Sequence, residues 1–291
     1  MSNPTSADIE DGHDYGIPTF PMADTIPKLI HQCFFGARKF TDELAENVAS
    51  IKARNPDWQH TLYDEEMMKG FIAQHYGAGI LRYYERIDPK YGSARTDLFR
   101  YLMLYKVGGM YLDVKSTVTR PLDDLIKPGD RYLLGQWDNP NIADRAGWGM
   151  HSELAHVDRG EFQQWHIICA PGHPFLRAVI LSVLGNIDRY LPWRDGTGAH
   201  GTFKLTGPIA YTLAIAPLRT DDNSRIINTV DAGLEYTIFA SRSHAALFKS
   251  HYFRLTDSIV KLGPVLSLVA KIVFFSRRVQ GSLRHRLKLN R

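Results

Sequence analysis

The sequence predicts an α/β fold with a mostly parallel central sheet flanked by helices. Residues 26–36 and 58–63 have the apolar or alternating character of strands, and a capped helical pattern over 41–54 separates them. A strand, helix, strand order of this kind requires a crossover connection, which makes the two strands parallel. A second helical pattern, over 93–107, runs into Gly108-Gly109 and a short apolar strand that ends at Asp113.

The remaining elements follow in chain order. Thr41 is a capping residue, and Leu44, Val48 and Ile51 recur at helical spacing behind it. Residues 64–84 are predicted to be helical, with a break at 77–79. Strands are expected over 132–135 and 162–171, followed by a helix over 175–190.

Length and charge indicate one catalytic domain with distinct ends. The 291 residues contain 44% hydrophobic and 23% charged side chains, which is ordinary for a globular protein. Residues 1–24 carry five acids and no lysine or arginine, and we expect a mobile segment there. Residues 258–291 hold eight bases and no acid. We therefore predict an acidic segment over 1–24, a catalytic domain over 25–256 and a basic amphipathic tail over 257–291.

The two cysteines and the amino-terminal residues bear on the cellular compartment. Cys33 and Cys169 lie in apolar contexts without metal-ligand spacing, so they predict neither a zinc site nor a disulfide framework. The sequence begins without the basic and apolar regions of a signal peptide, which argues against export. We expect a cytoplasmic protein.

The candidate site lies at the strand that ends in an acid. Ligands of open α/β sheets bind beyond the carboxyl ends of the strands, which is where Asp113 is predicted to be. Asp97 and Arg100 are one helical turn apart, so they project from one helix face. A guanidinium suits phosphate oxygens, and a carboxylate accepts hydrogen bonds from vicinal hydroxyls. The alternative is an ordinary surface ion pair.

This pattern carries a family resemblance. Asp97, Arg100 and the run Gly-Gly-Met-Tyr-Leu-Asp at 108–113 resemble the glycosyltransferases that contain a DXD sugar-binding region, among them the fungal initiating α-mannosyltransferases. The resemblance covers about residues 26–128, and shorter pieces appear at 171–174 and 206–208. It implies a GT-A-like nucleotide-sugar-binding fold, a UDP- or GDP-sugar donor, a glycan or lipid-linked acceptor and retention at the anomeric carbon.

The resemblance also implies roles for individual residues, listed here together. Asp97, Arg100 and Asp113 are expected to be catalytic, and the donor is expected to contact Phe34, Gln32, Tyr111, Lys115 and His251. Phe34 stands where the family stacks an aromatic on the base, although it is as well explained as core. His31, beside Gln32, is explained equally by a ligand contact and by a satisfied core histidine.

One position departs from the family pattern. The chain has Asp113-Val114-Lys115 where Asp-x-Asp is usual, so the acid that normally ligates the metal is replaced by an ammonium. Mn²⁺ and Mg²⁺ prefer oxygen ligands, so a cofactor metal is expected to bind weakly through Asp113 or to be absent. Lys115 would then stabilise the leaving diphosphate as a fixed charge. The alternative is a solvated lysine just past a strand.

The tail and a tryptophan-containing loop suggest further contacts. Residues 265–275 are an apolar run too short to span a membrane, and the following bases favour an interfacial helix on an anionic membrane at the inner face. A core helix and a solvated tail are the alternatives. Nucleic acid is disfavoured, because the bases lack interleaved aromatics. Trp137 and Trp148 suit stacking on an acceptor sugar, or plain packing.

The function predicted from these observations is transfer of a hexose from a nucleotide sugar. Rivals within the same fold are a nucleotide-sugar hydrolase and a transferase with a protein acceptor. The non-catalytic rival is a degenerate domain that binds sugar or membrane as a scaffold, for which the substitution at Lys115 is the argument.

Overall fold

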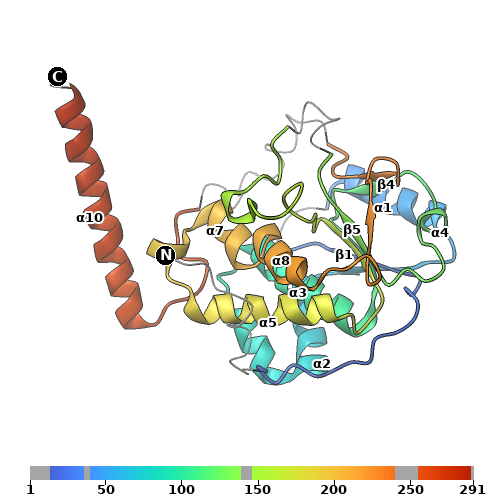
Figure 1. Ribbon diagram of the computed structural model, residues 1–291. Coiled ribbons are helices and arrows are strands. Elements are labelled where there is room, and N and C mark those ends of the chain that lie inside the picture. Colours follow the sequence, from blue (N-terminus) through green and yellow to red (C-terminus); the bar gives the residue numbers. More distant parts are fainter. Residues whose placement is uncertain (1–13, 36–39, 139–145, 240–254, 290–291) are drawn as a thin grey trace.

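The computed structural model describes residues 14–35, 40–138, 146–239 and 255–289. In these ranges a six-stranded mixed sheet of order β2-β1-β3-β6-β5-β7 lies among helices, and β4 and β8 form a small second sheet (Figure 1). The strands are β1 (Leu29–Cys33), β2 (Gln59–Tyr63), β3 (Gly109–Leu112), β4 (Thr117–Val118), β5 (Tyr132–Gly135), β6 (His166–Cys169), β7 (Arg225–Ile227) and β8 (Leu234–Glu235). The helices of four or more residues are α1 (Asp42–Arg54), α2 (Glu65–Arg86), α3 (Gly92–Val107), α4 (Leu122–Leu125), α5 (Pro174–Arg189), α6 (Pro192–Asp195), α7 (Gly198–Leu205), α8 (Pro208–Ile215) and α10 (Pro264–Leu289).

The large sheet is parallel except around β6. β1 pairs in parallel with β2 and with β3, and β5 pairs in parallel with β7, whereas β6 runs antiparallel to both β3 and β5. The carboxyl ends of β1, β3 and β5 therefore meet the amino end of β6 at one edge of the sheet. Residues just outside these strands are brought together at this edge.

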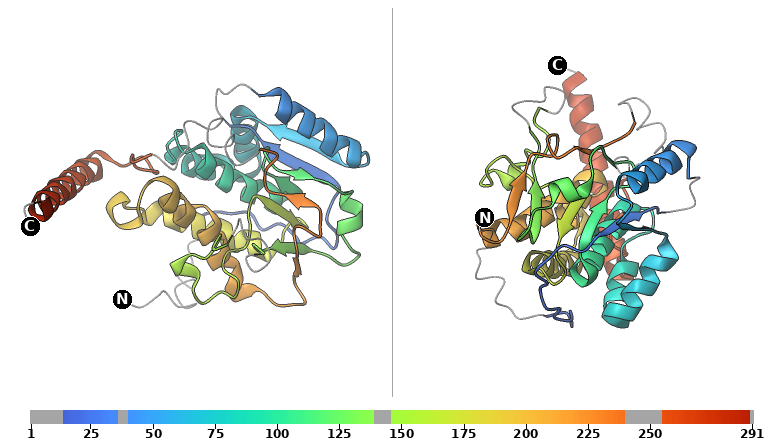
Figure 2. Two further views of the ribbon diagram at one scale, coloured as in Figure 1. Left: turned by 90° about the horizontal axis from the view of Figure 1, so that it is seen from above. Right: turned by 90° about the vertical axis from the view of Figure 1, so that its right-hand side faces the viewer.

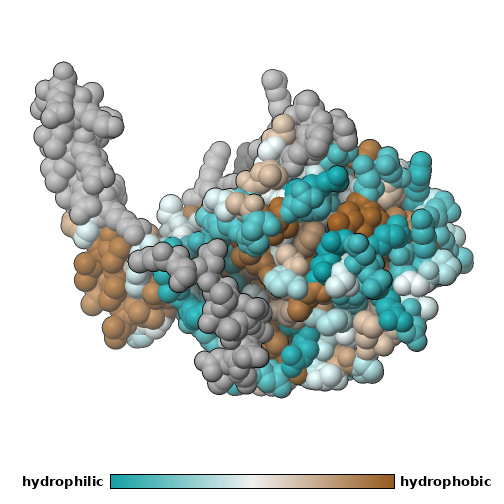
Figure 3. All heavy atoms as spheres, in the orientation of Figure 1, coloured by the Kyte–Doolittle hydropathy of each residue, from teal (hydrophilic) through white to brown (hydrophobic). Residues whose placement is uncertain are grey.

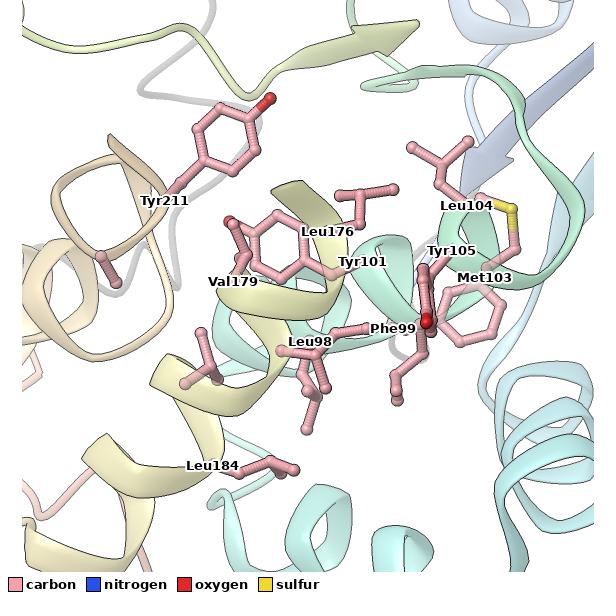
Figure 4. Packing of buried hydrophobic residues seen from close by; sticks show 14 of the residues in the cluster. Leu98, Phe99, Tyr101, Met103, Leu104, Tyr105, Leu176, Val179, Leu184 and Tyr211 are labelled. Carbon is pink, nitrogen blue, oxygen red and sulfur yellow. The ribbon is translucent and has the colours of Figure 1, made fainter. Parts of the chain in front are cut away.

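Both faces of the sheet are buried. Along β3, Met110 and Leu112 enter one apolar cluster while Tyr111 enters the other, as the two-residue period of a strand requires. One cluster joins the sheet to α2, α3, α5 and α8, and the other joins it to α1, α4, β4 and β8. Figure 4 shows the first, where Leu98 and Tyr101 of α3 face Leu176 and Val179 of α5. The predicted α/β class is confirmed.

The Gly108-Gly109 pair turns α3 directly into β3. The two glycines have φ of 67° and 94°, in the left-handed region that other residues rarely adopt. A Cβ on Gly109 would lie 2.6 Å from the carbonyl oxygen of Leu29, and one on Gly108 would lie 2.5 Å from Cδ of Pro171. Glycine is therefore required by close packing as well as by backbone conformation.

The other predicted helices begin and end nearly where the sequence placed them. The Thr41 hydroxyl accepts a hydrogen bond from the Leu44 amide and caps α1, and the Asp64 carboxylate caps α2. The break expected at 77–79 is a kink at Gly77, where φ is 76°. The strand expected over 162–171 is shorter, because β6 covers only its second half, and Phe162 forms an isolated bridge with Gln136.

The described part of the acidic amino-terminal segment, residues 14–24, packs on the domain, which corrects our expectation of a mobile lead-in for that part. Ile17 is buried in the core, and the Phe20 ring contacts Tyr76 and Tyr105. The Ala23 amide donates to the carbonyl of Pro171. We based the expectation on the acidic composition of this segment, but the packing of Ile17 and Phe20 on the core holds the segment in place.

The tail begins as part of the domain and leaves it as a helix. Ile259 and Val260 belong to the core, Val260 forms a bridge with Ile87, and the Lys261 amide donates to the Arg86 carbonyl. From Pro264 the helix α10 extends away from the body (Figures 1 and 2). No helix in the described ranges is both long enough and apolar enough to cross a membrane.

Candidate functional site

The first part of the site is a buried ion pair on α3. Arg100 Nη2 donates to Asp97 Oδ1 at 2.6 Å, and the Thr206 hydroxyl donates to Asp97 Oδ2 at 2.8 Å. Only 2% of Asp97 and 5% of Arg100 is exposed. Arg100 Nη1 also donates to the Gln164 carbonyl at 2.7 Å, and its guanidinium lies 4.4 Å from the centre of the Tyr111 ring. The predicted one-turn pair therefore exists, but it lies inside the protein.

The Asp113 carboxylate connects this pair to solvent. Asp113 directly follows β3 at the carboxyl edge of the sheet, and its side chain is 25% exposed. Its Oδ1 accepts a hydrogen bond from the Tyr111 hydroxyl at 2.9 Å and lies 3.4 Å from Arg100 Nη1. Asp113 is therefore held by buried groups on one side and remains reachable on the other.

Lys115 faces the same carboxylate from the outer side. Its Nζ lies 3.8 Å from Asp113 Oδ2 and donates a hydrogen bond of 2.8 Å to the Tyr236 hydroxyl. The ammonium also lies 4.0 Å from the centre of the Tyr236 ring, a cation–π contact. The side chain is only 15% exposed, which argues against the alternative of a solvated lysine.

Burial dominates the electrostatics of the inner pair. Burial raises the pKa of Asp97 to about 6, although Arg100 and the Thr206 hydrogen bond act in the opposite direction. Burial alone would lower the pKa of Arg100, but the neighbouring Tyr111, Asp97 and Asp113 raise it above its ordinary value. Arg100 therefore stays charged, whereas Asp97 changes between its neutral and its ionised form around pH 6.

Residues of β1 lie next to the site at the same edge. Gln32 is fully buried, its side-chain Nε2 donates to the Asp113 carbonyl at 3.4 Å, and its Oε1 accepts from His60 Nε2 at 2.8 Å. His31 is also buried, between the Gly108 carbonyl and the Tyr63 hydroxyl, so it is a satisfied core histidine. Phe34 is half-buried with its ring 5.0 Å from that of Phe40, and its role in base stacking stays a prediction.

The donor atoms around Asp113 do not fit a divalent cation. The carboxylate stands between the guanidinium of Arg100 and the ammonium of Lys115, and neither cation can ligate a metal. Across the described ranges, no group of three or more His, Cys, Asp or Glu side chains is arranged to hold a metal ion. The chemistry at this position is that of a carboxylate paired with fixed positive charges.

Sequence reasoning missed three members of the site. Gln164 and Tyr236 lie in irregular segments without a local signal, and only the fold brings them to Arg100 and Lys115. Thr206 could have been found from the sequence, because it begins the short stretch at 206–208 that resembles the family. The structure explains this stretch, because the Thr206 hydroxyl donates a hydrogen bond to Asp97. The predicted contact His251 lies outside the described residues.

Known proteins resemble this chain in the same region. Residues 41–132 match the family model described as a glycosyltransferase sugar-binding region containing a DXD motif. An initiation-specific α-1,6-mannosyltransferase of Schizosaccharomyces pombe is 28% identical over 67% of this chain. An inositol phosphoceramide mannosyltransferase of the same organism is 34% identical over 35% of it. The chain spans about half (49%) of the first relative's length and 27% of the second's.

Solved structures of low identity align with parts of this chain. The PaToxG glycosyltransferase aligns with a TM-score of 0.48 and 16% identity over 70% of this chain and 73% of its own. The sugar transferase LgtC aligns with a TM-score of 0.37 and 14% identity over 81% of this chain and 88% of its own. The α/β fold with a mostly parallel central sheet that the sequence predicts is the fold observed here. The matched residues 41–132 run from α1 through α4 and contain Asp97, Arg100 and Asp113, so the constellation lies within the region that is similar to the glycosyltransferase sugar-binding region with a DXD motif.

Proposed function

We propose that the protein is a glycosyltransferase that moves a hexose from a UDP- or GDP-sugar to a glycan or lipid-linked acceptor. The observation that carries the proposal is the Asp113 carboxylate, partly exposed at the carboxyl edge of the sheet between two fixed cations. The mannosyltransferase relatives support mannose as the hexose to test first. A degenerate scaffold has no need for the complete Asp97, Arg100, Tyr111 and Asp113 arrangement, so we do not propose it.

The reaction requires a leaving diphosphate to be stabilised. The bond between the anomeric carbon and the diphosphate oxygen breaks, and its electron pair leaves with the diphosphate. The acceptor hydroxyl oxygen bonds to the anomeric carbon, and its proton passes to the departing diphosphate. In this proposal Asp113 accepts hydrogen bonds from donor hydroxyls, and Lys115 faces the diphosphate as charge develops on it. Asp97 and Arg100 hold Asp113 in position.

The same arrangement leads us to propose transfer without a divalent metal. A Mn²⁺ or Mg²⁺ ion on Asp113 would lie close to the Lys115 ammonium, which is 3.8 Å from Asp113 Oδ2, and the two positive charges would repel each other. The ammonium already supplies positive charge there, and electrostatic stabilisation of this type is often the largest contribution of an active site. Retention at the anomeric carbon is a further part of the proposal, supported by the family resemblance.

A donor panel tests the activity. The full chain is mixed with GDP-mannose, UDP-glucose, UDP-galactose or UDP-N-acetylglucosamine, each with Mn²⁺ or with EDTA. Binding is measured by calorimetry and slow donor hydrolysis by NMR. We expect one donor to bind and to be hydrolysed at similar rates under both conditions. Absence of binding by every donor would contradict the activity, and turnover that is lost in EDTA and restored by Mn²⁺ would contradict metal independence.

We also propose that α10 lies on an anionic membrane surface, at the inner face as expected from the sequence. Seven of its apolar side chains are exposed: Val265, Leu266, Leu268, Val269, Ile272, Phe274 and Phe275. Figure 3 shows the lower part of the helix, at the lower left of the view, as a hydrophobic surface. Exposed Val265 (75%) and Phe275 (70%) are unfavourable in water and favourable at the boundary of acyl chains.

Basic side chains lie near the point where the tail leaves the domain. A cavity of about 620 Å³ next to the point where the tail leaves the domain is lined by Arg82, Arg86 and Lys261 together with Tyr15, Tyr83, Gly79 and Glu85. Each base near an anionic surface contributes about 1 kcal/mol. Flotation with vesicles of phosphatidylcholine and phosphatidylserine should capture the full chain. A Val265→Ser, Phe275→Ser double variant should not float with the vesicles. Equal flotation of the wild type and the double variant would contradict the proposal.

A further inference from the structure

A cluster of aromatic side chains lies at the same sheet edge as Asp113. Trp165 immediately precedes β6, and Trp137 follows β5 by two residues. Because β6 and β5 follow β3 in the sheet, these two residues extend the edge from Asp113 away from β1, which carries Phe34. A donor whose base lies toward Phe34 would therefore place its sugar between Asp113 and the aromatic cluster.

Four side chains form this aromatic cluster: Trp137, Trp148, Trp165 and Tyr236. The Trp148 ring centre lies 5.0 Å from that of Trp137 and 5.8 Å from that of Tyr236, at interplanar angles of 79° and 84°. The Tyr236 ring centre lies 5.7 Å from that of Trp165. Trp137 and Trp165 are buried, whereas Trp148 is 41% exposed. The cluster thus ends in one indole that is fixed by edge contacts and open to solvent.

The described residues that flank Trp148 are held by close packing and hydrogen bonds. Gly147 and Gly149 have φ of 81° and 73°, and a Cβ on Gly149 would lie 2.6 Å from both Glu161 Cγ and Trp137 Cδ1. The Glu161 amide donates to the Gly149 carbonyl at 3.0 Å. The buried Glu161 carboxylate accepts from Trp137 Nε1 at 2.6 Å and pairs with His151 Nε2 at 2.8 Å. A ligand that stacks on Trp148 therefore orders little that is not already ordered.

Tyr236 joins the aromatic cluster to the charged site. Its hydroxyl accepts from Lys115 Nζ, and its ring lies between Lys115 and Trp148. We propose that Trp148 and Tyr236 form the acceptor subsite, where a pyranose ring stacks its C–H face on the exposed indole. This inference rests on the proposed function and adds the place and chemical class of the acceptor-binding surface.

Two observations favour a sugar over plain packing. A Trp that served only the core would be covered, yet Trp148 exposes its surface beside a charged site. The buried Nε1 of Trp165 has no hydrogen-bond partner among the described residues, and a hydroxyl or a bridging water would satisfy it. Aromatic faces with a few polar groups between them are the usual lining of carbohydrate-sized binding sites.

The test separates stacking from donor chemistry. Saturation-transfer NMR is recorded on the full chain with methyl α-D-mannopyranoside, methyl β-D-glucopyranoside and methyl β-D-galactopyranoside. We expect saturation transfer from the wild type to at least one glycoside, and we expect Trp148→Ala to lose most of that saturation-transfer signal. Trp148→Phe should keep it. Met150→Ala, an exposed residue of the same loop, is the matched control and should equal the wild type.

The kinetic consequence is specific to the acceptor. With the donor that is hydrolysed, Trp148→Ala should raise the acceptor KM about tenfold, the factor that corresponds to the upper range of aromatic stacking energies. The Met150→Ala control should keep the acceptor KM, the kcat and the donor hydrolysis of the wild type. Equal saturation-transfer signals with the wild type and with Trp148→Ala, or no saturation transfer from the wild type to any glycoside, would overturn the inference. A wild type that hydrolyses no donor would contradict the proposed function instead, while the glycoside measurement still decides the subsite.

Discussion

The motif that spans α3 and β3 has two halves with opposite environments. On α3, Asp97 and Arg100 are 2% and 5% exposed. On the inner side the Thr206 hydroxyl bonds Asp97 and the Gln164 carbonyl bonds Arg100, whose buried Nε has no hydrogen-bond partner among the described residues. After β3, the side chains of Asp113 and Lys115 are 25% and 15% exposed and face each other at 3.8 Å. The sequence presents all four as charged residues of one motif, but only the second pair can meet a donor directly.

This difference separates positioning from contact. The inner pair fixes the Asp113 carboxylate through Arg100 and Tyr111, whereas the outer pair offers one negative and one positive group to a ligand. Loss of an inner residue should therefore affect both stability and activity. Loss of an outer residue should affect activity alone.

The largest effect is expected at Asp113. Asp113→Ala removes the only carboxylate of the motif that is both partly exposed and bonded to the inner pair, so donor turnover should fall at least about a thousandfold. Turnover is followed by NMR, with thermal unfolding as a check of the fold. The exposed Asp231→Ala is the control and should keep full activity. Activity of Asp113→Ala within threefold of wild type would remove Asp113 from the site.

The second effect tests the inner half. Arg100→Ala leaves Asp97 buried without its charged partner, which should lower the free energy of unfolding by about 3–5 kcal/mol. Arg177→Ala, which breaks the exposed pair with Asp14, should lower it by about 0–1 kcal/mol. Urea unfolding followed by fluorescence measures both. Equal midpoints for the two variants would show that burial does not distinguish the pairs.

The third effect tests the outer cation. Lys115→Ala should reduce donor turnover about 10²–10³-fold with little change in unfolding midpoint, since one electrostatic contact to the leaving group is lost. Lys115→Arg should retain part of the activity because the charge is kept. Added Mn²⁺ should not rescue Lys115→Ala, and full rescue would mean that a metal performs the role we give to the ammonium.

The smallest effect concerns pH. Since burial raises the pKa of Asp97 to about 6, its charge is lost as pH falls through this value, and kcat/KM should decline on the acid side of about pH 6. The same shift means that this carboxyl lowers fold stability as pH rises from about 4 to 6, because its ionised form is disfavoured when buried. Asp97→Asn should be less active and should lack this acid limb. Persistence of the limb in Asp97→Asn would assign it to another group.

Local signals predicted most of the fold. The capping residue Thr41, the start of the second helix near residue 64, the Gly108-Gly109 stop and the short apolar strands lie where the sequence placed them, because each depends on neighbours within a few positions. The antiparallel direction of β6 was not predicted, since strand direction is decided by which distant segment pairs with it. The packing of residues 14–24 was missed for the same reason, because the pocket that receives Ile17 is made by other elements.

The sequence predicted which residues form the site better than it predicted how they are arranged. Spacing alone placed Asp97, Arg100 and Asp113 together, and Lys115 was identified by its departure from the family pattern. Spacing gave no measure of burial, and the structure shows that the Arg100 guanidinium contacts Asp97 and the Gln164 carbonyl. The contact of Arg100 with the diphosphate, which the family resemblance implies, stays a prediction. Tyr236 is more than a hundred residues from Lys115 and no pattern connects them.

The segment that carries Tyr236 closes over the end of β3 late in the chain. The Ser116 hydroxyl donates to the Tyr236 carbonyl, the Ile238 amide donates to the Lys115 carbonyl, and β8 pairs with β4 just beside them. Closing a loop of this length carries an entropic penalty that local contacts do not repay, so such pairings tend to form after the local elements. During synthesis from the amino terminus, Asp113 and Lys115 would emerge and reach their strand well before Tyr236 exists. The outer half of the site would then be completed among the last steps of folding, and the nascent chain would have no finished donor pocket until the domain is nearly whole.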